Sequence, residues 1–214
     1  MSAVMTAFTT RCCKSAWISR LLWQWAVLAV LALGGLAARA ENAELTALRV
    51  ERGDEGVFLT ARVDFELSSV AQDALQKGIP VHFVAEAEVL RERWYWYDHT
   101  VASVQRYMRV AYQPLTRRWR LNTSSEPIVN TGLGVSLSQN YDSLDEVITA
   151  VQRIGRWKIA NAADLDSGGR HVLRFRYRLD ASQLPRALQI GSVGHADWAV
   201  WVERRIDLTQ ELGR

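Results

Sequence analysis

Cysteine is nearly absent from this 214-residue chain, which has only Cys12 and Cys13. In a lipoprotein, the cysteine that carries the lipid follows the apolar stretch of the signal peptide. Both cysteines here precede the long apolar stretch near the N-terminus, so neither is a lipoprotein cysteine. Everything after residue 13 is free of thiols. Disulfides, thiolate nucleophiles and cysteine metal ligands are therefore excluded from the rest of the chain.

Catalytic and cofactor motifs are also missing. The four histidines show no i,i+4 pair and no H-E-x-x-H, and no G-x-S-x-G surrounds any serine. Asp98-His99 and His195-Ala196-Asp197 place a carboxylate near an imidazole, but no nucleophile motif accompanies them. Gly132-Leu133-Gly134 lacks the third glycine of a dinucleotide loop. We predict a protein that is not an enzyme and binds no metal or cofactor, with a hydrolase using His99 or His195 as the weakest hypothesis.

A net basic charge is missing from most of the chain. The whole sequence has 26 Lys/Arg against 23 Asp/Glu, but residues 1–40 hold four of the Lys/Arg and no Asp or Glu. Residues 41–214 therefore carry 22 basic and 23 acidic side chains, a formal charge of −1. A nucleic-acid-binding domain needs a basic surface, so this class of function is excluded.

The N-terminal 40 residues have the pattern of a secretory signal peptide. Arg11, Lys14 and Arg20 precede an apolar run, and Ala38-Arg39-Ala40 supplies a small-residue cleavage site. We predict that residues 1–40 are removed and that residues 41–214 form one periplasmic domain.

The alternative is that residues 21–38 are retained as an inner-membrane anchor, with the domain on the periplasmic side of the membrane. A transmembrane helix needs about 20 apolar residues. The run from Leu21 to Leu36 has 16 and reaches 18 only with Ala37 and Ala38. Cleavage is therefore favoured.

The domain alternates apolar and polar residues with a period of two, which is typical of antiparallel sheet with one buried face. The alternating segments span 57–67, 82–90, 171–180 and 198–203. Their apolar rows are Val57, Leu59, Ala61, Val63, Phe65 and Leu67; Phe83, Ala85, Ala87 and Val89; Leu173, Phe175, Tyr177 and Leu179; and Trp198, Val200 and Val202.

Two short helices interrupt this pattern. Ser69 with Gln72, and Ser143 with Glu146, have the spacing of capping boxes, and helical spacing follows the second as far as Ile154. Residues 122–134 read as a long loop or loose hairpin. We predict about eight strands in an antiparallel β-sandwich of immunoglobulin-like architecture, with an α+β fold as the alternative.

Two features are candidates for a binding surface. The aromatic run Trp94-Tyr95-Trp96-Tyr97, read as a strand, points its tryptophans one way and its tyrosines the other. It is either an aromatic platform for a sugar, a lipid or a partner strand, or a structural strand. As a structural strand it is buried on both faces, or its tyrosines lie at a sheet edge with their hydroxyls in water. The structural interpretation is favoured.

The second feature is a row of arginines, Arg174, Arg176 and Arg178, on one face of a strand. It either binds an anion or pairs across strands with an acidic row such as Glu86/Glu88 or Asp64/Glu66, and pairing is favoured. Arg117, Arg118 and Arg120, around Trp119, are interpreted in the same way.

Several segments, in this order, resemble a bacterial family without an assigned function, domain-of-unknown-function family 4390. The resemblance spans roughly residues 45–208. It implies that this is an exported proteobacterial protein, of a kind often encoded beside a membrane sensor histidine kinase. It implies no catalytic or binding residues. The segments are Asp73–Pro80, Arg91–Trp96, Tyr112–Arg117, Ser143–Glu146, Leu179–Arg186 and Asp197-Trp198.

These observations favour an exported accessory domain that binds an inner-membrane or periplasmic protein through a sheet edge or the aromatic run. The alternative is a carrier of a small lipid or sugar, with Trp94, Trp96, Trp119 and Trp201 lining its pocket.

Overall fold

The computed structural model describes residues 43–93, 97–128, 136–165, 169–186, 188 and 198–211. All of them belong to Glu41–Arg214, one of the two units into which the chain divides. The predicted signal peptide and the alternative anchor at 21–38 lie outside the described residues. Within those residues, no helix has the length and apolar character that a membrane crossing requires.

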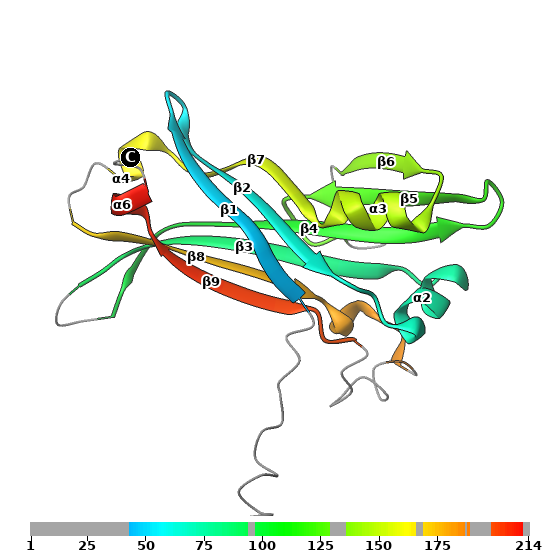
Figure 1. Ribbon diagram of the computed structural model, residues 1–214. Coiled ribbons are helices and arrows are strands. Elements are labelled where there is room, and N and C mark those ends of the chain that lie inside the picture. Colours follow the sequence, from blue (N-terminus) through cyan, green and yellow to red (C-terminus); the bar gives the residue numbers. More distant parts are fainter. Residues whose placement is uncertain are drawn as a thin grey trace, which may run out of the picture. The chain divides into compact units, whose positions relative to one another are not determined.

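The described strands form two antiparallel sheets (Figure 1). The three-stranded sheet has the order β1-β2-β7, with β1 at Ala43–Gly53, β2 at Gly56–Phe65 and β7 at Arg153–Ala160. The six-stranded sheet has the order β6-β5-β4-β3-β8-β9. Its strands are β3 at Val81–Arg91, β4 at His99–Gln113, β5 at Arg118–Ser124, β6 at Leu137–Tyr141, β8 at His171–Leu179 and β9 at Trp201–Asp207.

The predicted β-sandwich is confirmed. The fold is mainly β, its two sheets are antiparallel, and the few helices are short. In Figure 1 the three-stranded sheet lies over β3, β8 and β9. The β4–β5–β6 end of the larger sheet extends beyond it. A sandwich forms because each sheet has one apolar face that must be covered.

The predicted alternation of buried and solvent-facing residues is also confirmed. On β2, Leu59, Ala61 and Val63 are buried, while Thr60 and Arg62 are exposed. The predicted apolar rows of β3 and β8 point into the same core. Trp198, Val200 and Val202 are buried there too, but the strand predicted over 198–203 begins only at Trp201, so Val202 alone of these three lies on β9. Burial of these rows provides the main driving force of folding, at about 25 cal/mol per Å² of apolar surface.

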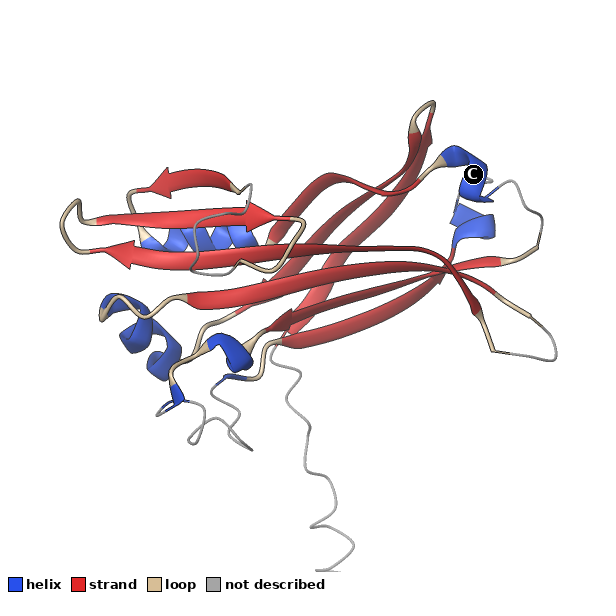
Figure 2. Cartoon of the chain, turned by 180° about the vertical axis from the view of Figure 1, so that it is seen from behind, coloured by secondary structure: helices blue, strands red, loops and turns tan. Residues whose placement is uncertain are grey.

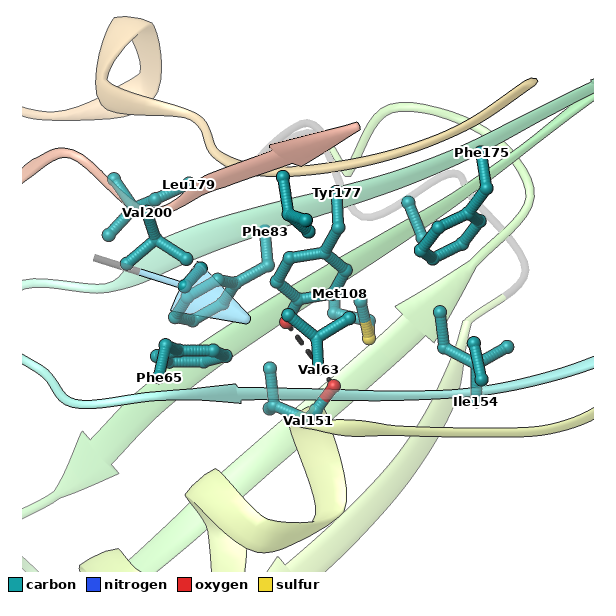
Figure 3. Packing of buried hydrophobic residues seen from close by; sticks show 14 of the residues in the cluster. Val63, Phe65, Phe83, Met108, Val151, Ile154, Phe175, Tyr177, Leu179 and Val200 are labelled. Atoms are coloured by element: carbon teal, nitrogen blue, oxygen red, sulfur yellow. Dashed lines mark hydrogen bonds between the residues drawn. The ribbon is translucent and has the colours of Figure 1, made fainter. Parts of the chain in front are cut away.

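Three aromatic rings tie the sheets together (Figure 3). The ring centroids of Phe65 and Phe83 are 5.4 Å apart, and those of Phe65 and Tyr177 are 5.9 Å apart. The hydroxyl of Tyr177 donates a hydrogen bond of 3.2 Å to the carbonyl oxygen of Val151. Complete burial raises the pKa of Tyr177 well above its ordinary value, so the hydroxyl keeps its proton and remains a donor.

Both predicted helices are present, but the predicted N-cap of the first one is wrong by one residue. Helix α2 spans Ser69–Gln76, but its N-cap is Ser68, whose Oγ accepts from the Ala71 amide at 3.1 Å. The predicted cap was one residue too late because the capping-box spacing to Gln72 pointed to Ser69, whereas the neighbouring serine caps the helix without a box partner at the third position.

Helix α3 spans Leu144–Val151 and is capped by Ser143, as predicted. The Glu146 carboxylate accepts from the Asp142 amide at 3.2 Å, which completes the box one residue earlier than usual. Ile154 lies on β7 instead of on the helix. The described residues also include three short helical turns: α4 at Ala162–Leu165, the 3-10 turn η1 at Ala181–Gln183 and α6 at Leu208–Glu211.

The predicted loop at 122–134 begins too early. Residues 122–124 belong to β5, where all three pair with β4 and residues 122–123 also pair with β6. Their polar character suggested a loop, but a strand with one wet face accepts polar residues. Residues 129–135 lie outside the described residues.

Candidate functional site

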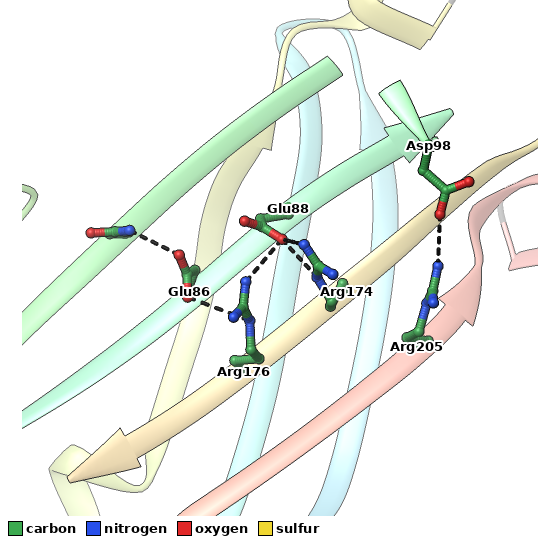
Figure 4. Close-up of polar contacts among 7 residues, drawn as sticks. Glu86, Glu88, Asp98, Arg174, Arg176 and Arg205 are labelled. Carbon is green, nitrogen blue, oxygen red and sulfur yellow. Dashed lines mark hydrogen bonds and ion pairs between the residues drawn. The ribbon is translucent and has the colours of Figure 1, made fainter. Parts of the chain in front are cut away.

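The outer face of the six-stranded sheet, which is turned away from the three-stranded sheet, carries the predicted arginine row (Figure 4). Arg174 Nε donates to Glu88 Oε2 at 2.7 Å. Arg176 lies 3.0 Å from Glu88 and 3.4 Å from Glu86. The predicted cross-strand pairing with Glu86/Glu88 is therefore confirmed. These two arginines are neutralised within the sheet.

Two more arginines near this face are paired as well. Arg178 Nη1 lies 3.7 Å from Asp180, and Arg205 Nη2 lies 3.0 Å from Asp98. The alternative acidic row at Asp64/Glu66 does not meet the arginines, because Asp64 lies on the other sheet and pairs there with Arg62 at 3.0 Å. The hydrogen bond from Arg62 lowers the pKa of Asp64 below its ordinary value.

The arginines around Trp119 follow this pattern only in part. Arg118 pairs with Asp142 at 3.1 Å, so the pairing interpretation is confirmed for this residue. Arg120 Nε donates to the neutral Asn140 Oδ1 at 3.4 Å, which ties β5 to β6 without an ion pair. Arg117 has a φ of 53° in the tight turn between β4 and β5, and no ion pair between it and a described residue is found.

Most of the aromatic run lies outside the described residues, which omit Trp94, Tyr95 and Trp96. Tyr97 is described and is 89% exposed. It lies in the connection between β3 and β4, so the strand predicted at this position does not include Tyr97. Whether the run binds a ligand or a partner stays a prediction.

The four tryptophans of the carrier hypothesis do not share one pocket. Trp119 is buried in the core beside Tyr112, with ring centroids 4.8 Å apart. Trp201 is 52% exposed on β9, with three strands between it and β5. Trp119 faces the core and Trp201 faces away from it, because Trp201 alternates with buried Val202.

The histidines assemble no catalytic group in the described residues. His99 is exposed at the start of β4, its neighbour Asp98 is engaged by Arg205, and His195 lies outside the described residues. His171 is 5% exposed at the start of β8. No cluster of three His, Cys, Asp or Glu with metal-binding geometry occurs among the described residues.

Folding changes the pKa of His82, which lies on the outer face of β3. Burial lowers its pKa from 6.5 to about 4, and repulsion from Arg109 acts in the same direction against attraction by Asp180. A neutral His82 contributes stability that is fully present above pH 6.5 and is lost as the pH falls from 6.5 towards 4.

The free energy of unfolding falls in both proteins when the pH is lowered from 7 to 4.5. We expect this fall to be smaller in a His82→Gln variant than in the wild type by about 1–2 kcal/mol, a value that allows for solvent screening of a partly exposed ring. Urea unfolding of both proteins at both pH values measures this difference. An equal loss in the two proteins would show that His82 does not contribute to acid sensitivity.

A groove lies where the six-stranded sheet extends beyond its partner sheet. Its floor is the inner face of β4, β5 and β6, and α3 and β7 cover that face (Figure 2). Its volume is about 510 Å³, within the range of small-molecule sites. The apolar part of the lining comes from Met108, Leu121, Leu137, Ala150 and Trp157.

The polar part of the lining is basic and hydroxyl-rich. The hydroxyl of Tyr141 donates to Gln139 at 2.7 Å, and desolvation raises the pKa of Tyr141. Among the described residues that line the groove, none has a carboxylate. Its polar members are Arg106, Arg153, Thr123, Ser124, Ser125, Gln139 and Tyr141.

Arg106 is the functional candidate that sequence reasoning missed. Its register opposite Ala85 puts it on the inner face of β4, between Val104 and Met108. Its guanidinium carbon lies 4.9 Å from the centroid of the Trp157 ring. Burial lowers the pKa of Arg106, although an arginine keeps its charge at any ordinary pH. A charged residue in the apolar phase of a strand is the signal that would have identified it.

A second, smaller cavity of about 320 Å³ lies where the end of β2 meets α3. Glu66 and Asp145 are among its lining residues, and no described lining residue is basic. The two cavities therefore differ in the sign of their charge.

The sheet edges also differ in charge. The described edge strands are β1 and β7 in one sheet and β6 and β9 in the other. Charged side chains on an edge prevent unwanted strand pairing. They occur on β1, β7 and β9, whereas β6, with the sequence Leu-Ser-Gln-Asn-Tyr, has none. Residues 137–140 of β6 are exposed, and Leu137 is 65% exposed.

Comparison with known proteins identifies one family. The model of the family described as domain of unknown function (DUF4390) matches residues 40–206, which is most of the chain. This match confirms the resemblance predicted from the sequence. No curated protein and no solved structure matches the chain.

Proposed function

Because this chain belongs to the DUF4390 family, whose description assigns no function, we propose a function from its geometry: it is a non-enzymatic envelope protein that binds a segment of another envelope protein along β6. In this proposal residues 1–40 are a cleaved signal peptide and the domain acts in the periplasm. A retained anchor at 21–38 would leave the domain on the same side of the membrane.

The observation that carries the proposal is the uncharged, exposed edge at β6. A free edge presents unpaired backbone amide and carbonyl groups, which an extended segment of a partner can bind as an added strand. Alternate side chains of that strand would then fall on the groove side and on the outer side of the sheet. The partner class is an inner-membrane or periplasmic protein, and a membrane sensor kinase is the first candidate.

The test is site-specific photocrosslinking in the full-length protein within its own envelope. A crosslinker at Ser138 on β6 is expected to capture one membrane protein, and the same crosslinker at Leu115 is not. Leu115 is the matched control because it is fully exposed in the turn between β4 and β5.

An Asn140→Lys change places a charge on the β6 edge and is expected to abolish the crosslink at Ser138, while Leu115→Lys leaves it unchanged. Equal capture at both positions would contradict the proposal. So would a crosslink that survives Asn140→Lys, or one that joins two copies of this chain.

A specific observation favours a second function, the carriage of a small ligand. The groove beneath β4, β5 and β6 has the size of a ligand site, although its lining differs from the four tryptophans expected from the sequence. Trp157, which was not among them, is the tryptophan that lines it.

A further inference from the structure

Arg106 is a partly buried cation for which the described residues supply no counter-ion. Burial alone lowers the pKa of Arg106, and no nearby carboxylate acts against this effect. The outer-face arginines differ, because Arg174 and Arg176 both contact Glu88. Removing a cation from water without an anion costs free energy. Stacking on Trp157 offsets only about 0.5–2 kcal/mol of that cost.

Arg106 has a second cation nearby. Arg153, the first residue of β7, lines the same groove, and no ion pair between it and a described residue is found. Thr123 and Tyr141 add hydroxyl groups to the lining. Two arginines and neighbouring hydroxyls are the donor set that binds a carboxylate or a phosphate.

The rest of the groove is suited to hydrocarbon. Met108 and Leu121 form an apolar floor, and the Trp157 ring forms part of the wall. Leu137 lies at the rim, where it is largely exposed. An anion-binding end beside an apolar wall matches a molecule that combines a charged head with an apolar chain.

We propose that this groove binds an anionic amphiphile, with Arg106 and Arg153 holding the carboxylate or phosphate and Met108, Leu121 and Trp157 contacting the chain. The proposal rests on the second candidate function, ligand binding in the groove, and is independent of strand binding at β6. The same head-group chemistry occurs in a free long-chain carboxylate and in an anionic phospholipid.

The experiment is a fluorescence titration of the purified full-length protein with a dansyl-labelled undecanoate. The wild type is expected to bind the probe, dodecanoate to displace it, and the uncharged dodecanol not to displace it. Co-sedimentation with phosphatidylglycerol-containing vesicles, compared with phosphatidylcholine vesicles, distinguishes a phospholipid from a free carboxylate.

An Arg106→Gln variant is expected to bind the probe at least about tenfold more weakly, because it loses a charge-assisted hydrogen bond. Arg120→Gln makes the same change of charge on the opposite face of the sheet and is expected to leave the affinity unchanged. Thr123→Trp fills the groove and keeps both arginines, so it decides the matter if Arg106→Gln does not fold.

Three results would overturn the proposal. The first is that the wild type binds neither the probe nor anionic vesicles. The second is that both Arg106→Gln and Thr123→Trp bind the probe as the wild type does, and the third is that dodecanol displaces the probe as effectively as dodecanoate. The β6 variant Asn140→Lys is expected to bind the probe normally. In the wild type, absence of the crosslink at Ser138 together with intact probe binding would show that the proposal of strand binding at β6 fails. A crosslink at Ser138 without probe binding would show that the proposal of ligand binding in the groove fails.

Discussion

Replacing Phe83 with alanine is expected to lower the free energy of unfolding by about 3–5 kcal/mol, the cost of a large cavity in a packed core. Phe83 is completely buried on β3. Its ring centroid lies 5.4 Å from that of Phe65 and 6.1 Å from that of Tyr177, so the change removes one member of the aromatic cluster that joins the two sheets. A domain of this size has only about 5–15 kcal/mol of stability, so the loss is a large part of the total.

Urea unfolding followed by far-ultraviolet circular dichroism measures this loss. Phe58→Ala is the matched control: Phe58 lies on the other face of β2 and is only half-buried, with Arg156 4.6 Å from its ring centroid. We expect the control to cost about 1 kcal/mol or less. Similar losses in the two variants would mean that Phe83 is not at the centre of the core.

Replacing Gly56 with alanine is expected to lower the free energy of unfolding by about 2–4 kcal/mol, because the backbone conformation at this position does not suit a residue with a side chain. Gly56 begins β2 with a φ of +144°, a conformation that residues with a side chain rarely adopt. A Cβ atom there would lie 2.3 Å from the carbonyl oxygen of Ala160 on β7. The backbone of β2 or β7 would have to move, and both strands belong to the three-stranded sheet.

The control is the same substitution at Gly155 on β7, where an added Cβ meets nothing within 4 Å. We expect Gly155→Ala to change the stability by less than about 1 kcal/mol, in the stabilising direction, because alanine loses less conformational entropy on folding. Thermal and urea unfolding of both variants would check this contrast. A neutral Gly56→Ala would show that the close approach between Gly56 and Ala160 is not required by the fold.

Strands with one apolar face could be predicted from the sequence, and the helix at Leu144–Val151 could be predicted from Ser143 and Glu146. Both signals are local: a period of two specifies a strand face, and a cap needs residues only three positions apart. The cap of α2 was placed one residue late because the capping-box spacing to Gln72 pointed to Ser69 instead of Ser68. The polar residues 122–124 looked like a loop because pairing with β4 and β6 is not a local property.

The binding candidates depended much more on tertiary structure. The arginine row of β8 was visible in the sequence, but the register between β3 and β8 decided that Arg174 and Arg176 meet Glu86 and Glu88. A shift of one residue would have put those charges on the core face, so burial selects the register. Trp119 and Trp201, which were expected in one pocket, are separated because strand order, which no local pattern encodes, puts β5 and β9 far apart in the sheet.

The sequence alone determined the predicted export segment, the absence of thiol chemistry after residue 13, and the faces of the strands, because each depends on composition or on spacing along the chain. Tertiary structure decided which faces are covered. The six-stranded sheet is wider than its partner, so α3 and β7 cover its β4–β5–β6 end in place of a second sheet and leave a groove. The same excess width leaves β6 as an uncharged edge and places Arg106 beside Trp157. Only the packing of sheets of unequal width could bring these features together.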